Sequence, residues 1–125
     1  MKSIIVSLAV TGLMIAGSAL AADMPELAKK HGCIACHKID IKLVGPSWMD
    51  ISKAYNSNGA TTTGKKVADI LADNKAKTAQ ELLVQKVSKG GKGNWGTMPM
   101  PANDPIGAKQ DDIKALVKFI LNLAK

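Results

Sequence analysis

The sequence predicts an all-α domain with four to five short helices and long connecting loops. Three observations support this fold class. Apolar residues near the C-terminus recur at helical spacing, with Ile113, Leu116, Val117 and Ile120 on one face. Signals for the start and end of helices divide the preceding chain into short segments. No segment alternates polar and apolar residues in the manner of a strand.

The first two helices are indicated by their boundary residues. Pro25, in a first-turn position, opens a short helix, and Gly32 ends it. Ser47 is the N-cap of a second helix that extends to about Tyr55, where the turn sequence NSNG stops it.

Two further helices precede the C-terminal one. Val67, Ile70 and Leu71 share one face of the first. A capping box at residues 78–81 (TAQE) opens the second, and the glycine pair at residues 90–91 ends it.

A C-x-x-C-H run, Cys33-Ile34-Ala35-Cys36-His37, is the most specific chemical signal in the chain. Two thiols one helical turn apart reach the two vinyl groups of one porphyrin, and His37 then lies beneath the iron. The run therefore predicts one haem c, attached covalently through Cys33 and Cys36, with His37 as an iron ligand.

Two other kinds of site suit these residues less well. A thioredoxin-like redox pair follows a buried strand in a βαβ unit, whereas residues 23–32 indicate a short charged helix. Zinc sites draw ligands from separated pairs, but both cysteines and both histidines of this chain lie within residues 31–37.

Residues 1–21 are typical of a cleaved secretory signal peptide. Lys2 gives a basic start, residues 4–16 are mainly apolar, and residues 19–21 (ALA) form a small-residue cleavage site. The alternative is a retained membrane anchor, but the apolar run is shorter than the ~20 residues that span a bilayer. We expect cleavage before Ala22, a mature domain of residues 22–125 in the periplasm, and no stable membrane insertion after cleavage.

The mature chain is short of bulky residues for its core. Its only aromatic residues are Trp48, Tyr55, Trp95 and Phe119. A domain of this size has difficulty burying enough surface with aliphatic side chains alone, so an enclosed porphyrin is expected to form much of the core.

The surface charge is predicted to come from lysine. Without the leader, sixteen lysines and no arginine face ten acidic residues, a net charge of +6. Lysine without arginine favours brief docking on acidic redox proteins, and the absence of any nucleic-acid motif argues against a nucleic acid partner. Two lysine groups are expected to border the haem edge: Lys29, Lys30 and Lys38, and Lys86, Lys89 and Lys92.

The segment 93–105 is predicted to be an apolar loop over the haem. Three prolines and two glycines exclude helix and strand, yet the segment contains Trp95, Met98 and Met100. A methionine sulfur from this loop is expected to bind the iron opposite His37. The residues alone do not choose between Met98 and Met100, and filling of space is the alternative role for both.

With these motifs the chain resembles the class I cytochromes c, in particular the small soluble bacterial monohaem type of the periplasm. The resemblance extends over nearly the whole mature chain and rests on residues 23–25, 32–37, 44–46, 95–101 and 117–121. It implies the class I cytochrome c fold, in which short helices and long loops wrap around one covalently bound haem.

The resemblance also implies roles for single residues. Met100, between two prolines, matches the axial ligand that completes His/Met coordination with His37. The carbonyl of Pro46 accepts a hydrogen bond from the non-ligating nitrogen of His37, and Trp95 bonds a haem propionate. His31 is expected to lie in solvent near the haem edge and not to bind iron.

The implied function is one-electron transport between respiratory redox partners by a monomer. With both axial positions filled, no substrate site remains, so an enzyme is not expected. Two alternatives stay open: a dedicated haem subunit of a periplasmic oxidoreductase, and a ligand-binding haem protein with a labile methionine.

One feature departs from the resemblance. His37 and Met100 are 63 residues apart, more than in the shortest members of the family, and the surplus lies around residues 56–77. This segment has three interpretations: a docking element, a cover for one haem edge, or a tolerated insertion.

Overall fold

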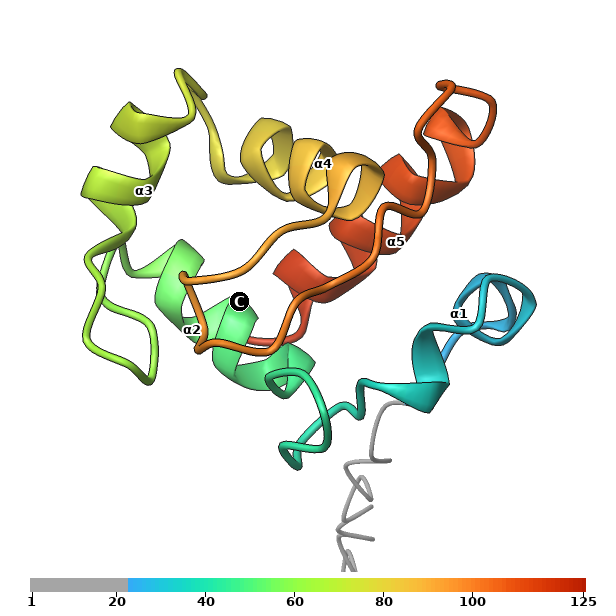
Figure 1. Ribbon diagram of the computed structural model, residues 1–125. Coiled ribbons are helices and arrows are strands. Elements are labelled where there is room, and N and C mark those ends of the chain that lie inside the picture. The colour runs from blue at the N-terminus through green and yellow to red at the C-terminus, as the bar shows by residue number, and fades with distance from the viewer. Residues whose placement is uncertain (1–22) are drawn as a thin grey trace, which may run out of the picture.

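The computed structural model describes residues 23–125 (Figure 1), and over these residues the architecture is all-α, as predicted. The β-type pairings in this part of the chain are two isolated bridges. The elements in chain order are α1 (Glu26–Lys30), the 3₁₀ turn η1 (Cys33–Ala35), α2 (Trp48–Asn56), α3 (Val67–Asp73), α4 (Ala79–Lys89) and α5 (Gln110–Asn122). The predicted signal peptide, residues 1–21, lies outside the described residues.

The C-terminal helix α5 is the centre of the packing. It contacts α4, α2 and α1 through the apolar face that the sequence predicted. Figure 1 shows the connection from α4 to α5, in orange, running to α2 and back before α5 begins. The buried apolar core is formed by Ala28, Trp48, Ile51, Ala54, Tyr55, Val67, Ile70, Leu82, Leu83, Ile113, Leu116, Val117, Ile120 and Leu121.

Two helices begin at the N-caps that the sequence indicated. The Ser47 hydroxyl accepts the N–H of Asp50 at 3.0 Å, and the Thr78 hydroxyl accepts the N–H of Glu81 at 3.1 Å. In the capping box at residues 78–81, the glutamate is expected to bond the N–H of Thr78. The Glu81 carboxylate instead accepts the N–H of the preceding residue, Lys77, at 2.9 Å. Each cap satisfies backbone donors that the first turn leaves unpaired.

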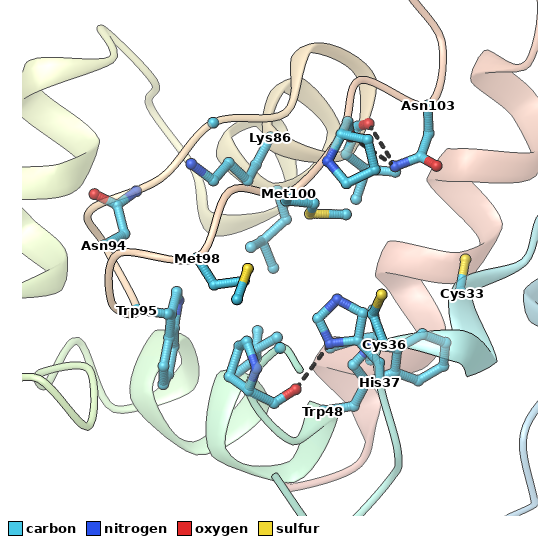
Figure 2. Close-up of a pocket in the computed structure, with 18 of the residues that line it drawn as sticks. Cys33, Cys36, His37, Trp48, Lys86, Asn94, Trp95, Met98, Met100 and Asn103 are labelled. Carbon is cyan, nitrogen blue, oxygen red and sulfur yellow. Dashed lines mark hydrogen bonds between the residues drawn. The ribbon is translucent and has the colours of Figure 1, made fainter. Parts of the chain in front are cut away.

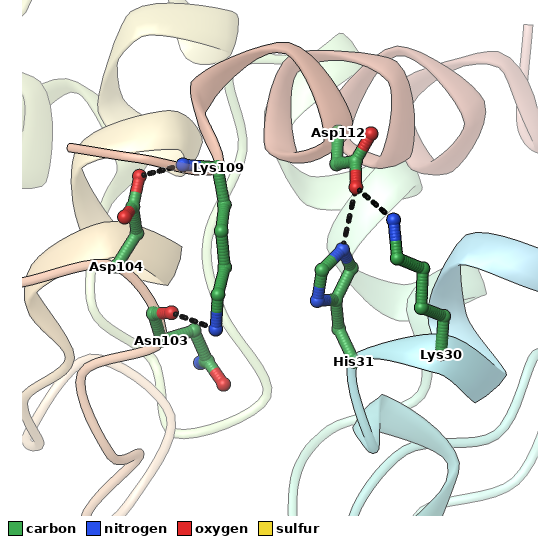
Figure 3. A network of polar contacts seen from close by, with 6 residues as sticks. All are labelled: Lys30, His31, Asn103, Asp104, Lys109 and Asp112. Carbon is green, nitrogen blue, oxygen red and sulfur yellow. Dashed lines mark hydrogen bonds and ion pairs between the residues drawn. The ribbon is translucent and has the colours of Figure 1, made fainter.

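The short helix α1 is tied to α5 by an ionic contact (Figure 3). Asp112, in the first turn of α5, accepts hydrogen bonds from His31 Nε2 at 2.7 Å and from Lys30 Nζ at 3.1 Å. These two bonds lower the pKa of Asp112. The His31 side chain is 12% exposed, so the expectation that it is solvated is wrong. Because Cys33 follows two residues later, this contact positions the cysteine motif against α5.

A buried carboxylate organises the start of α5. Asp104 accepts the N–H groups of Ala108 and Lys109 at 2.7 and 2.9 Å, and Gln110 Nε2 at 2.7 Å. Burial acts to raise the pKa of Asp104, but the bonds from Gln110, Lys109 and Ala108 outweigh it and lower the pKa. The N-cap position itself, Lys109, makes no side-chain capping bond, so Asp104 supplies this cap from a distance.

The surplus segment folds as a loop followed by a helix. Residues 57–66 form a loop closed by the bridge between Ala60 and Lys66, and α3 follows. Val67 and Ile70 are buried, so the predicted apolar face of this helix belongs to the core. None of the helices within residues 23–125 is both long and apolar enough to cross a membrane.

Candidate haem-binding site

An apolar cavity collects the residues that the sequence singled out (Figure 2). It lies between α2, α4 and α5 and two loops, residues 32–46 and 91–103, and encloses about 1290 Å³ with its open mouth included. All six predicted site residues line it: Cys33, Cys36, His37, Pro46, Trp95 and Met100. Residues separated by more than sixty positions in the sequence therefore share one cavity.

The two cysteines stand at one end of this cavity. The turn η1 begins after Gly32, whose φ of +72° lies in the left-handed region that favours glycine, and it brings Cys33 and Cys36 to the same wall. Both thiols are free and half-buried. Burial raises the pKa of Cys33, the reverse of the lowered value expected for a redox-active thiolate. Within residues 23–125, no cluster of three His, Cys, Asp or Glu residues could hold a metal ion such as zinc.

His37 is held in one orientation at the floor of the cavity. Its side chain is buried, and its Nδ1 donates to the carbonyl of Pro46 at 2.8 Å, the bond that the resemblance implied. Nε2 has no hydrogen-bond partner among residues 23–125 and points into the cavity (Figure 2). A Cβ on Gly45 would lie 2.4 Å from His37 Cε1, so only glycine fits behind the ring.

The segment 93–105, here called the methionine loop, forms the wall of the cavity opposite His37. Gly91 and Met100 exchange two backbone hydrogen bonds, each of 2.9 Å, and Asn103 N–H bonds the carbonyl of Val87 in α4. Gly90 lets the two segments approach, because a Cβ there would lie 2.3 Å from the Met100 carbonyl oxygen. The loop is thus fastened to the end of α4.

The two methionines differ in how the loop presents them. Both side chains lie on the side of the cavity that faces His37 (Figure 2). Met98 is 64% exposed, whereas Met100 is half-buried and is anchored through its backbone to Gly91. The better-anchored methionine is the one that the resemblance favours.

Trp95, Lys86 and Lys92 line the remaining edge of the cavity. The indole of Trp95 packs near Tyr55, with ring centroids 6.4 Å apart. Lys86, which was expected to border the haem edge, is half-buried in the cavity wall, where burial and then the nearby charge of Lys65 lower its pKa. Two of the other predicted docking lysines are engaged in ion pairs, Lys29 with Glu26 and Lys30 with Asp112.

The sequence did not reveal the contacts that form only when distant segments pack closely together. The position of Gly45 behind the His37 ring was not predicted, and Gly90 was predicted only to end a helix. A glycine directly before Pro46, eight residues after the predicted ligand, was the available signal for the first. No sequence signal pointed to Asp104.

The side chains of the cavity fit a haem. Two thiols stand at one end, an imidazole nitrogen with no partner in the described part of the chain faces the space, and thioether sulfurs lie opposite. Apolar side chains of α2, α4 and α5 supply most of the lining. This donor set matches a covalently attached porphyrin whose iron takes nitrogen and sulfur ligands.

Comparisons with known proteins agree with this site. A family model described as "Cytochrome c" matches residues 16–124. The chain is 40% identical over 116 residues to "Cytochrome c-551" of Allochromatium vinosum, covering 93% of this chain and 100% of that protein. It is 35% identical over 115 residues to "Cytochrome c-552" of Nitrosomonas europaea, covering 92% and 90%.

The fold also matches a solved structure. The crystal structure of wild-type Nitrosomonas europaea cytochrome c552 aligns with a TM-score of 0.55 at 35% identity. The alignment covers 78% of this chain and 96% of the other. The predicted helical fold and the predicted kind of cofactor are therefore confirmed.

Proposed function

Because the chain belongs to the cytochrome c family, we propose that it is a periplasmic one-electron carrier whose haem iron lies between His37 and Met100. The cofactor is one haem c, and in this proposal Cys33 and Cys36 attach it. When bound, haem supplies the exchange of one electron at its iron. The protein residues orient the group, exclude water from it and set its redox balance.

The orientation of His37 is the observation that carries the proposal. Its Nδ1 is committed to the carbonyl of Pro46 at 2.8 Å, so the neutral ring presents Nε2 to the cavity with its lone pair available. The same hydrogen bond increases the donor strength of the ring toward a metal. A buried imidazole arranged in this way, one residue after Cys36, serves as an axial ligand.

Met100 is the proposed iron ligand opposite His37. Two backbone bonds to Gly91 hold it opposite His37, and the prolines at 99 and 101 restrict the backbone on either side. A thioether ligand favours the ferrous state relative to a second imidazole and closes the second face of the iron. With both faces of the iron closed, no position remains for a substrate, so we propose electron transfer without catalysis.

The surface suits transient docking. Exposed apolar side chains, including Ile34, Val44 and Met98, lie on segments that line the cavity, and two lysines, Lys86 and Lys92, line it as well. A monomer carrying net positive charge would meet acidic redox proteins through this face. The leader-like residues 1–21 support a cleaved signal peptide and location in the periplasm.

Substitution of the two methionines tests the ligand assignment. Met100→Ala should abolish the weak long-wavelength sulfur-to-iron absorption band, lower the reduction potential and let carbon monoxide bind the reduced protein. Met98→Leu is the matched control and should change none of these, at a stability cost of about 1 kcal/mol for a similar-volume exchange. If Met98→Leu loses the band while Met100→Ala retains it, the proposed ligand is wrong.

A further inference from the structure

The first part of the methionine loop belongs to a hairpin, residues 91–100, that spans the cavity from α4 to α2. At its base, two backbone bonds of 2.9 Å join its first and last residues. At its tip, the Gly93 N–H bonds the Gly96 carbonyl at 2.8 Å, which leaves Asn94 and Trp95 at the turn. Figure 1 shows this segment, in orange, running from α4 to α2 and turning back. The hairpin therefore closes one face of the cavity.

The surplus segment holds the tip of this hairpin through Asn94. Thr63 Oγ1 donates to the Asn94 carbonyl at 3.0 Å, and Lys65 Nζ donates to Asn94 Oδ1 at 3.3 Å. The next residue, Trp95, packs near Tyr55 of α2, with ring centroids 6.4 Å apart. The tip is thus held both by α2 and by the surplus segment.

The loop 57–66 is itself braced. Thr61 is buried, its N–H bonds the Lys65 carbonyl at 2.9 Å, and its Oγ1 accepts the Lys65 N–H at 3.2 Å. Its hydroxyl also shares a 3.0 Å hydrogen bond with that of Thr63. Lys65 Nζ lies 3.7 Å from the Asp73 carboxylate of α3, the helix whose apolar face belongs to the core. The loop is therefore fixed to the body of the protein and cannot readily follow the hairpin outward.

The tip is the end of the hairpin that can release. The base is continuous with α4 and is held by backbone bonds, whereas the tip is held by two bonds to Asn94 and by the packing of Trp95. A thioether that leaves the iron does not by itself admit another ligand, because the hairpin still covers the space that faces His37. An external ligand can enter this space only when the tip moves away from α2.

We propose that the loop 57–66 is a latch that holds the hairpin tip closed through Asn94, and that its release controls the entry of external ligands to the iron. Neither Thr63 nor Lys65 lines the cavity, so both act through Asn94 as positioning residues. The proposal rests on the proposed methionine ligation but not on the choice between Met98 and Met100, since both belong to this hairpin. In this proposal the surplus segment is more than a tolerated insertion.

The test is the rate at which imidazole replaces the methionine ligand in the ferric haem protein, followed by loss of the sulfur-to-iron band. If opening precedes binding, this rate saturates at high imidazole concentration and then equals the rate of opening. Each lost bond is expected to accelerate opening by a factor of about 2–10, so the double variant Thr63→Val/Lys65→Met should open about tenfold faster or more. Asn94→Ala keeps the backbone carbonyl and should therefore match Lys65→Met alone.

Matched variants separate the latch from a general effect of the substitutions. Thr63→Ser and Lys65→Arg keep the two donors and should keep the wild-type saturating rate. Thr62→Val and Lys66→Met make the same chemical changes at exposed neighbours and should also leave the rate unchanged.

Hydrogen exchange in the reduced protein is the second measurement. The Gly93 N–H, at the tip, should exchange faster in the double variant, whereas the Met100 N–H, at the base, should keep its wild-type rate. General destabilisation would accelerate the exchange of both.

Three results would overturn the proposal. The first is a wild-type saturating rate in the variant Thr63→Val/Lys65→Met, and the second is an equal acceleration by Thr62→Val/Lys66→Met. The third is a wild-type rate that keeps rising in proportion to imidazole, which would show that release of the tip does not control entry. Failure of the proposed methionine ligation is distinguishable, because the wild-type ferric protein would then lack the sulfur-to-iron band before any imidazole is added.

Discussion

Gly45→Ala is expected to displace the imidazole of His37, the proposed iron ligand. The φ of Gly45 is compatible with alanine, so the effect comes from contact alone: the new Cβ would lie 2.4 Å from His37 Cε1, 2.9 Å from Nδ1 and 3.0 Å from Nε2. Ordinary contacts begin at 3.4 Å, so the ring must retreat by about 1 Å. That movement stretches its 2.8 Å bond to the carbonyl of Pro46 beyond the range of a hydrogen bond.

The size of the effect follows from two contributions. Overpacking of a buried site costs about 1–3 kcal/mol, and loss of one hydrogen bond costs about 0.5–1.5 kcal/mol. We therefore expect Gly45→Ala to lower the free energy of unfolding by about 2–4 kcal/mol, measured by urea denaturation of the ferric protein. The reduction potential should rise, since the Pro46 bond that strengthens His37 as a donor to ferric iron is lost.

Gly59→Ala is the matched control for this substitution. Its Cβ would meet the Ser57 hydroxyl at 2.9 Å, and this hydroxyl can rotate away. The control should change the free energy of unfolding by less than about 1 kcal/mol and leave the potential unchanged. If Gly45→Ala behaves like the control in both measurements, His37 is not confined as described.

Three other substitutions have expected outcomes. Gly90 has a φ of +70° and lies against the Met100 carbonyl, so Gly90→Ala should push the methionine loop away from α4. The sulfur-to-iron band should weaken and carbon monoxide should bind the reduced protein. An unaltered band would show that the position of Met100 does not depend on close contact between Gly90 and the loop. Ser52→Ala removes a fully buried hydroxyl that bonds the C-terminal end of α5, and should cost about 1–3 kcal/mol in urea denaturation. The lowered pKa of Asp112 means that its bond to His31 contributes stability above pH 3.8, which is lost as the pH falls through the folded pKa. Asp112→Asn should therefore destabilise the protein at neutral pH, and the difference from the wild-type protein should shrink in acid; a difference independent of pH would contradict this.

Local signals were sufficient to predict the helices and the covalent site. A cap depends on residues within one turn, so Ser47 and Thr78 marked the starts of α2 and α4 correctly. Gly32 ended the first helix through its own backbone preference. The C-x-x-C-H run is likewise local, since one helical turn brings its two thiols together.

Contacts between distant segments could not be predicted from the sequence. Asp104 caps α5 from outside the helix, so no position at the helix start revealed it. His31 was expected to lie in solvent, but it bonds the carboxylate of Asp112, which is 81 residues away along the chain. The half-burial of Lys86 could not be predicted for the same reason, because only the folded chain shows which lysines turn toward the cavity.

The two walls of the cavity hold their proposed ligands in different ways. Both are closed by backbone bonds over similar lengths of chain: Gly45 N–H bonds the carbonyl of Cys36 at 2.8 Å, and Gly91 and Met100 exchange two bonds of 2.9 Å. On the His37 wall a further bond, from Nδ1 to the carbonyl of Pro46 at 2.8 Å, fixes the side chain itself. On the Met100 wall the bonds with Gly91 hold the backbone, and the thioether is free to change rotamer. The imidazole can therefore keep its geometry when the thioether moves away, so in the proposed ligation exchange at the iron would occur on the methionine side.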